Sequence, residues 1–187
     1  MGFVIGGISA GANLAAVVAH LYQEKKDTPR LTGQYLCIPT TCEPAALPEK
    51  YKDLYLSREQ NKEALILNQK SIEMFEGKSG SLRQKTELSN LRKGHYKPDP
   101  LSPLRSPLLF PSHAGLPPTY IQICGADPLR DEGLLYEQVL REDGVDTKLD
   151  VFPGLPHGFW SWFPDATFSK DFQAKTVQGL KWLLEHK

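Results

Sequence analysis

The sequence has no excess of charge of either sign. Its 187 residues include 22 lysines and arginines and 22 aspartates and glutamates, so the formal net charge at pH 7 is zero. A chain without net charge has no long-range field to attract nucleic acid, an anionic membrane or an acidic polymer. We therefore expect no nucleic-acid partner, and the balance favours a small or neutral ligand.

Long apolar runs are also missing. No run approaches the roughly 20 residues that a membrane-spanning helix needs, and the amino terminus shows neither the charged leader nor the apolar stretch of a signal peptide. Hydrophobic residues make up 40% of the chain and charged residues 24%, as in ordinary globular proteins. We expect a folded protein with no membrane span.

Cysteine is scarce. Cys37, Cys42 and Cys124 are an odd number in a chain too long to need disulfide staples. Cys37 and Cys42 have no Cys or His partner at zinc-finger spacing. These observations predict a reducing compartment, the cytoplasm, and no metal site.

Short apolar segments bounded by Gly and Pro alternate with segments of helical periodicity. The expected strands are residues 3–5, 33–38, 119–124 and 148–152, and the expected helices are residues 10–22, 58–75, 131–142 and 168–186. This alternation is typical of an α/β fold with a mainly parallel sheet and helices on both faces. The first helix is apolar nearly all round, so we expect it to be buried.

The length predicts a single domain over residues 1–187. Residues 43–100 are charged and punctuated by Pro and Gly, and we expect them to form an excursion of helices and loops from the core. Within this excursion, residues 78–97 are rich in Lys and Arg but lack interleaved aromatic residues. That composition indicates a solvated surface rather than a nucleic-acid patch.

A Gly-x-Ser-x-Gly pattern at residues 7–11 lies between the first expected strand and the first expected helix. Small neighbours let the chain turn tightly enough to hold Ser9 in an exposed, strained position above the amino terminus of the helix. The pattern alone is weak, because a glycine-rich turn with a capping serine has the same letters. Its position between a strand and a helix favours a nucleophile.

A nucleophilic serine needs a histidine base and a carboxylate that orients the histidine. Of the five histidines, only His157 lies in a Pro- and Gly-rich loop directly after an expected strand. Asp127 follows the strand at residues 119–124 in the same way, although a turn-forming Asp before Pro is common. We expect Asp131 to cap the helix that follows it. Ser9, Asp127 and His157 all follow strands, where parallel sheets gather their chemistry.

With these motifs in the order Ser, Asp, His, the sequence resembles the hormone-sensitive-lipase-like esterases of the α/β-hydrolase fold, in a form that looks fungal. The likeness covers most of the chain. Three segments carry it: residues 7–15 resemble the nucleophile elbow, residues 127–133 the segment that holds the acid and residues 157–159 the segment that holds the base. The resemblance implies a Ser9–His157–Asp127 triad that cleaves small carboxyl esters through an acyl-serine intermediate, without a cofactor.

The same resemblance implies a missing part. Such esterases carry an upstream segment with a His-Gly-Gly-Gly loop that supplies most of the oxyanion hole, so we expect this chain to lack the N-terminal half and to offer only the Ala10 N–H. The loss of one oxyanion donor costs about 10²–10³ in kcat, which leaves the activity of the chain open. The strand at residues 3–5 would then be an exposed edge through which a homo-oligomer could form.

Two other functions stay open at this point. The chain could be a small-molecule-binding module without catalysis, or an inactive remnant of the same fold. Binding relatives of these esterases typically lack the base, and the presence of His157 counts against that alternative. Labelling of Ser9 by a fluorophosphonate probe separates the three functions, because only an activated serine reacts.

Overall fold

The computed structural model describes residues 2–23, 25, 29–75 and 99–186, so the Lys- and Arg-rich run expected to be solvated surface lies outside the described residues. One sheet of four parallel strands forms the centre of the molecule, in the order β1-β2-β3-β4. The strands are β1 (Val4–Ile8), β2 (Gly33–Cys37), β3 (Thr119–Cys124) and β4 (Thr147–Phe152). The expected α/β class and parallel sheet are confirmed.

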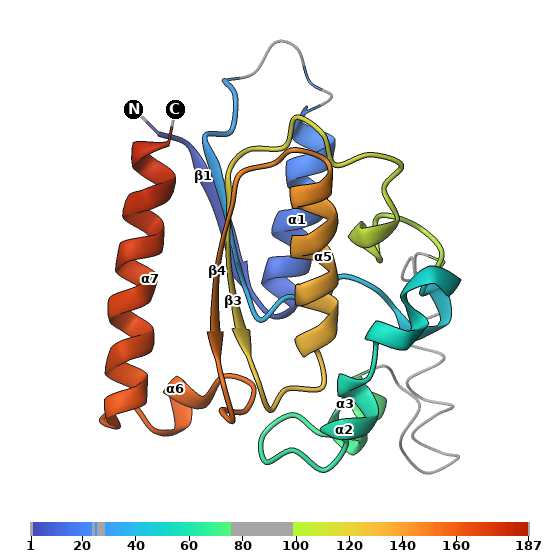
Figure 1. The fold of residues 1–187 in the computed structure, drawn as a ribbon, viewed down its shortest axis with the longest axis vertical. Coiled ribbons are helices and arrows are strands. Elements are labelled where there is room, and N and C mark those ends of the chain that lie inside the picture. Colours follow the sequence, from blue (N-terminus) through green and yellow to red (C-terminus); the bar gives the residue numbers. More distant parts are fainter. Residues whose placement is uncertain (1, 24, 26–28, 76–98, 187) are drawn as a thin grey trace, which may run out of the picture.

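Helices cover both faces of this sheet (Figure 1). Helices α1 (Ala10–Gln23) and α5 (Arg130–Glu142) pack on one face, and α7 (Thr167–Glu185) packs on the other. Helix α7 approaches β3 so closely that a Cβ atom added to Gly179 would lie 2.0 Å from the Tyr120 ring. Glycine at this position therefore sets the distance between the two layers.

The register of the strands brings their carboxyl ends to one edge of the sheet. The last residues of β1 and β2 pair as Ile8 with Cys37, and the last residues of β3 and β4 pair as Cys124 with Phe152. The chain leaves each of these strands at the same end of the sheet, toward which the arrows point in Figure 1. Loops that follow different strands therefore meet there.

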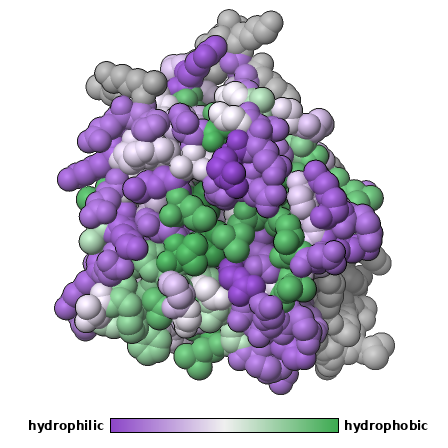
Figure 2. All heavy atoms as spheres, viewed as in Figure 1, coloured by the Kyte–Doolittle hydropathy of each residue, from purple (hydrophilic) through white to green (hydrophobic). Residues whose placement is uncertain are grey.

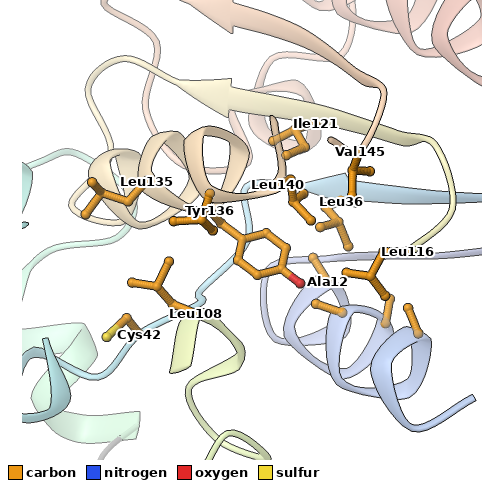
Figure 3. Packing of buried hydrophobic residues seen from close by; sticks show 14 of the residues in the cluster. Ala12, Leu36, Cys42, Leu108, Leu116, Ile121, Leu135, Tyr136, Leu140 and Val145 are labelled. Carbon is orange, nitrogen blue, oxygen red and sulfur yellow. The ribbon is translucent and has the colours of Figure 1, made fainter. Parts of the chain in front are cut away.

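The larger hydrophobic core lies between the sheet and the two helices α1 and α5. Figure 3 shows Tyr136 of α5 at the middle of this core, with its hydroxyl directed toward α1. That hydroxyl lies 3.3 Å from Nε2 of His20, whose ring stacks on Phe110 at a centroid distance of 3.8 Å. Burial, with a smaller contribution from nearby His113, lowers the pKa of His20 to about 3. A neutral imidazole thus forms part of the core.

Helix α5 ends as the sequence predicts. Gly144 has a φ of +79°, and its N–H donates to the Arg141 carbonyl oxygen at 3.1 Å. The N–H of Val145 reaches back to the Leu140 carbonyl oxygen at 2.9 Å. This pair of hydrogen bonds is the Schellman motif, which needs a left-handed residue where Gly144 stands.

The expectation that α1 is buried on all sides is wrong. Its alanine-rich face packs on the sheet, but Leu14, Val18 and Leu21 are 64%, 41% and 41% exposed. Within the part of the chain that the structure describes, β1 is an edge strand and no element covers the outer side of α1. The apolar composition of the helix therefore does not decide its burial, because burial depends on how many neighbours surround it.

The single helix expected over residues 58–75 is also wrong. The structure has two short helices instead, α2 (Ser57–Gln60) and α3 (Gln69–Phe75). Helix α2 ends at Asn61, which leaves helical geometry, and Asn68 starts α3 by accepting a hydrogen bond from the Ser71 N–H at 3.0 Å. Asparagine favours such caps over helix interiors, which explains the interruption.

Apart from α2 and α3, four further short elements lie in the described residues outside the sheet and its three long helices. They are the 3₁₀ turns η1 (Pro44–Ala46), η2 (Glu49–Leu54) and η3 (Pro107–Leu109) and the helix α6 (Phe159–Trp162). The division into one domain with an excursion at residues 43–100 stays a prediction. No helix among the described residues is long and apolar enough to cross a membrane.

The surface of the molecule is mixed in character. Figure 2 shows hydrophobic atoms gathered near the centre of the face seen in Figure 1, over β4 and the adjoining side of α5, with hydrophilic residues around them. Strand β4 is the second edge of the described sheet, and its Val151 is 39% exposed. Both edge strands therefore present apolar side chains to the outside.

Candidate active site

Ser9 lies in a strained turn between β1 and α1. Its φ is +55°, a left-handed value that residues other than glycine rarely adopt. A Cβ atom added to Gly7 would lie 2.2 Å from the backbone of Gly11, so the turn closes only because position 7 lacks a side chain. The Ser9 N–H donates to the Cys37 carbonyl oxygen at 2.8 Å, which fixes the turn to β2. The expected elbow is therefore present in the backbone.

His157 lies in the loop that follows β4. The loop is fastened to its neighbour by a hydrogen bond of 3.0 Å from the Ala126 N–H to the Leu155 carbonyl oxygen. Gly158 then takes a φ of +65° and allows α6 to begin directly after the histidine. Phe159 is fully buried against Phe152 and Phe172, so an aromatic cluster supports the loop from beneath.

Asp127 lies in the loop that follows β3 and is 1% exposed. One carboxylate oxygen, Oδ1, accepts a hydrogen bond from the Leu129 N–H at 2.9 Å. The other oxygen, Oδ2, lies 2.6 Å from Nδ1 of His157. Both oxygens therefore have partners, as a buried carboxylate requires.

The three side chains chosen from the sequence form one chain of hydrogen bonds. Nε2 of His157 lies 3.1 Å from Oγ of Ser9, while Nδ1 of the same ring faces Asp127. The Asp127 carboxylate can only accept, so Nδ1 carries the proton and Nε2 presents its lone pair to the serine hydroxyl. The imidazole can thus take a proton from Ser9, and the carboxylate can stabilise the charge that results.

Ala10 is the first residue of α1 and follows Ser9 directly. The N–H groups of a first helical turn have no acceptor within the helix, and the helix dipole adds positive potential there. The Ala10 N–H is therefore suited to stabilise negative charge beside Oγ of Ser9. Across the described ranges, no group of three or more His, Cys, Asp or Glu side chains is arranged to hold a metal ion.

Two cysteines lie buried near these residues. Burial raises the pKa of the Cys37 thiol to about 12, although a hydrogen bond with Tyr35 partly offsets the effect. Burial, together with the nearby Asp127 carboxylate, also raises the pKa of the Cys124 thiol. Both side chains therefore remain protonated thiols at neutral pH and do not act as nucleophiles.

Sequence reasoning missed two asparagines, Asn61 and Asn13, whose side chains hold loops in place. Asn61, at the end of α2, donates a hydrogen bond to the Asp127 carbonyl oxygen at 3.1 Å. Asn13 in α1 likewise bridges two loops, since its Nδ2 donates to the carbonyl oxygens of Thr40 and Arg105. No local pattern marks Asn61, because its partner lies 66 positions away in the sequence.

The role expected for Asp131 is wrong. Its carboxylate does not cap α5; Oδ2 accepts hydrogen bonds from the N–H groups of Leu56 and Ser57 at 2.7 and 2.6 Å. These N–H groups begin α2, so Asp131 caps a helix distant in sequence rather than its own. The reason is that α5 begins at Arg130 with Leu129 as its N-cap residue, so Asp131 lies within the first turn of the helix rather than at the capping position.

Comparison with known proteins agrees with this architecture. The profile of a family described as "alpha/beta hydrolase fold" matches residues 2–161. An AB hydrolase superfamily protein of Schizosaccharomyces pombe is 36% identical over 186 residues, which are 99% of this chain and 50% of that protein. A versiconal hemiacetal acetate esterase of Dothistroma septosporum is 34% identical, over 97% of this chain and 51% of the esterase.

A solved structure shows the same arrangement. The crystal structure of vibralactone cyclase is 41% identical to this chain and superimposes with a TM-score of 0.83. The match covers 97% of this chain and 49% of the cyclase. The chain therefore spans about half the length of the relatives that it matches.

Proposed function

The chain belongs to the alpha/beta hydrolase fold family, and on that basis we propose that it is a serine hydrolase that cleaves small carboxyl esters through an acyl-serine intermediate. The observation that carries the proposal is the unbroken path of hydrogen bonds from Ser9 through His157 to Asp127, with distances of 3.1 and 2.6 Å. The names of relatives support the choice of reaction, since the Dothistroma septosporum protein is called an acetate esterase.

In the first half of the reaction, Oγ of Ser9 attacks the ester carbonyl carbon while Nε2 of His157 takes the hydroxyl proton. Asp127 holds the imidazole in the tautomer that this transfer needs and stabilises the imidazolium. The proton then passes from Nε2 to the leaving alcohol as the bond between carbonyl carbon and alcohol oxygen breaks. The products of this half are the free alcohol and the acyl group on Ser9.

Negative charge develops on the carbonyl oxygen during each attack. In the proposal, the Ala10 N–H donates to this oxygen, and the amino terminus of α1 adds favourable potential. The strained backbone of Ser9 supports this arrangement, because in a nucleophile elbow the N–H of the residue after the serine is one of the oxyanion donors.

In the second half, a water molecule replaces the alcohol. His157 removes a proton from the water as its oxygen attacks the acyl carbon, and then returns a proton to Oγ of Ser9. The carboxylic acid leaves and the serine is regenerated. Every proton transfer in this scheme uses Nε2 of His157. The side chain of His157 is only 13% exposed.

We propose lactone formation as a second reaction, because the structural relative with 41% identity is named a cyclase. If the acyl group on Ser9 carries its own hydroxyl, that hydroxyl can attack the acyl carbon in place of water. The product is then a lactone, and the proton of the hydroxyl returns through His157 to Ser9. The same three residues serve both reactions, so only the nucleophile in the second half differs.

The proposal includes a cytoplasmic location in a fungal cell. Three free, buried cysteines support a reducing compartment, since none of them is paired in a disulfide. Two of the matched relatives are proteins of Schizosaccharomyces pombe and Dothistroma septosporum, which supports the fungal source. Fractionation of cells that express a tagged copy tests the location directly.

The test of the reaction is labelling by a fluorophosphonate probe followed by peptide mapping. We expect the probe on Ser9, loss of labelling in Ser9→Ala and His157→Ala, and unchanged labelling in the matched controls Ser161→Ala and His186→Ala, whose side chains take no part in the hydrogen-bonded path. The first two variants should also lose hydrolysis of p-nitrophenyl acetate, and the two controls should keep it. Labelling that persists in Ser9→Ala would refute the assignment, and a folded but unlabelled wild-type protein would favour a binding module or an inactive remnant.

A further inference from the structure

The loop that carries Asp127 is held by a segment that lies far from it in the sequence. We call residues 125–131 the acid loop and residues 55–61 the clamp segment. The clamp segment includes α2, which Figure 1 shows at the end of the molecule toward which the strand arrows point. Hydrogen bonds join the two segments along their length, although they lie far apart in the sequence.

At one end of the clamp segment, Asn61 contacts the residue proposed as the acid. Its Nδ2 donates to the backbone carbonyl oxygen of Asp127 at 3.1 Å, and the Arg130 N–H donates to the same oxygen at 3.1 Å. Two donors from different directions fix the orientation of this carbonyl. The Cα–Cβ bond of Asp127 belongs to the same residue, so the donors also limit where its carboxylate points toward His157.

At the other end, Ser57 and Asp131 exchange hydrogen bonds. Oγ of Ser57 donates to the Pro128 carbonyl oxygen at 2.7 Å and accepts from the Asp131 N–H at 3.1 Å. The Asp131 carboxylate accepts in return from the N–H groups of Ser57 and Leu56. Ser57 is fully buried, so these partners are the ones that satisfy its hydroxyl. The acid loop thus has fixed contacts at Asp127 and at the residues that follow it, Pro128 and Asp131.

An ion pair anchors the clamp segment beneath these contacts. Arg58 donates from Nε and Nη2 to Oε1 of Glu132, and the Tyr55 hydroxyl donates to the same carboxylate oxygen at 2.8 Å. Oε2 of Glu132 accepts from the Thr41 N–H at 2.9 Å, which ties the pair to the chain after β2. The clamp segment is therefore attached to the core at a point that does not involve Asp127.

From this geometry we infer that Asn61 is a positioning residue for the Ser9–His157–Asp127 path, and that the clamp segment fixes the direction of the Asp127 carboxylate. This inference rests on the proposed function. Asn61 touches neither the substrate nor the reacting atoms; it acts through the Asp127 backbone. Misplacing a group by about 1 Å can cost about 100-fold in rate, so a small rotation of the acid loop is enough to lower turnover.

The test compares Asn61→Ala and Asn61→Asp with Asn68→Ala, which changes the same residue type in the same excursion at the cap of α3 instead. We expect Asn61→Ala to lower kcat for p-nitrophenyl acetate by about 10- to 100-fold with KM changed less than about twofold. Asn61→Asp should lower kcat further, because it places a carboxylate oxygen against the Asp127 carbonyl oxygen. Asn68→Ala should keep the wild-type kcat.

A second readout does not depend on turnover. The hydrogen on Nδ1 of His157, held between that nitrogen and Oδ2 of Asp127, should give a strongly deshielded proton NMR signal, assigned by its loss in Asp127→Ala. We expect this signal to shift or broaden in Asn61→Ala and to be unchanged in Asn68→Ala. Ser57→Ala, which removes the other contact of the acid loop, should act like Asn61→Ala and serves if the latter fails to fold.

These outcomes separate the inference from the proposed function. Wild-type turnover no faster than that of Ser9→Ala would refute the proposed function, while the NMR comparison would still decide whether Asn61 positions the acid. A wild-type signal and wild-type kcat in both Asn61 variants would overturn the inference and leave the proposed function standing. A loss of kcat with an unmoved signal would also overturn it, because the variant would then act by another route.

Discussion

Arg58 and Glu132 form an ion pair in which two guanidinium nitrogens, Nη2 and Nε, lie 2.7 and 3.1 Å from the same carboxylate oxygen. The Glu132 side chain is fully buried and the Arg58 side chain is 21% exposed. Burial alone would lower the pKa of Arg58, but the adjacent Glu132 carboxylate raises it above its usual value, so the guanidinium stays charged. The pair joins the clamp segment to α5 and to the chain after β2.

Glu132→Ala should destabilise the protein strongly. Removing one partner of a buried ion pair leaves the other charge uncompensated, which typically costs about 3–5 kcal/mol. Chemical denaturation measures the loss in the free energy of unfolding. The control is Glu49→Ala, which breaks the solvent-exposed pair of Glu49 with Lys52 and should have little effect. Equal stability of the two variants would show that the Glu132 network adds no more to the free energy of unfolding than the exposed pair does.

The two glycines of the Gly-x-Ser-x-Gly pattern should respond differently to alanine. In Gly7→Ala the new methyl group would collide with the Gly11 backbone, so we expect loss of the elbow and of probe labelling at Ser9. In Gly11→Ala nothing lies within 4 Å of the added carbon, and alanine favours the helix. Gly11→Ala should therefore keep its labelling and gain up to about 1 kcal/mol in stability. Similar labelling of both variants would contradict the geometry of the turn.

Stability should fall in acid because of His20. Its pKa is lowered from 6.5 to about 3 by burial and then by His113, so between these values the unfolded chain binds a proton that the folded chain does not. The sign follows: the free energy of unfolding decreases as the pH falls from about 6.5 toward 3, with a slope of about 1.4 kcal/mol per pH unit for one proton. Above pH 6.5 this dependence disappears.

Urea denaturation at several pH values tests the role of His20. His20→Gln, which cannot titrate, should be less stable at pH 7 but should show a shallower acid slope than the wild-type protein. His186→Gln, which changes a histidine at the end of α7 and outside this core, serves as the control. Burial also lowers the pKa of His113, so His113 accounts for part of any slope that remains in His20→Gln. An unchanged slope in His20→Gln would show that His20 is not the responsible group.

The expected homo-oligomer through the edge strand β1 remains a proposal. A polypeptide with this sequence should self-associate, because β1 is an edge strand of the sheet that the structure describes and the outer face of α1 carries exposed apolar side chains. Light scattering after size-exclusion chromatography measures the mass. Leu14→Glu should reduce association, whereas Leu65→Glu, at an exposed position in the excursion, should not. A monomeric wild-type protein at high concentration would rule the proposal out.

Much of the candidate site was predictable because its signals are local. A small-residue turn between a strand and a helix marked Ser9, and loops directly after two strands marked Asp127 and His157. Parallel strands bring their carboxyl ends to one edge, so the positions along the chain already implied a common location. The distances of 3.1 and 2.6 Å agree with that expectation.

Other features were not predictable, because they depend on which segments become neighbours. Apolar periodicity over residues 58–75 predicted one helix, whereas the caps at Asn61 and Asn68 divide it. The apolar composition of α1 predicted full burial, although the described sheet leaves Leu14 and its neighbours exposed. In each case the local pattern favours a helix or burial, and the surrounding structure decides whether the segment is helical or buried.

The sequence by itself predicted the parallel α/β arrangement and, through its resemblance to known esterases, the family. It also singled out Ser9, Asp127 and His157 as candidates, since each of them lies in a short local motif. Only the tertiary structure decided that Asn61 and Asp131 join the clamp segment to the acid loop. The physical reason is that a hydrogen bond across 66 positions of sequence leaves no periodic trace. It exists because packing of the core brings donor and acceptor within reach after the chain has folded.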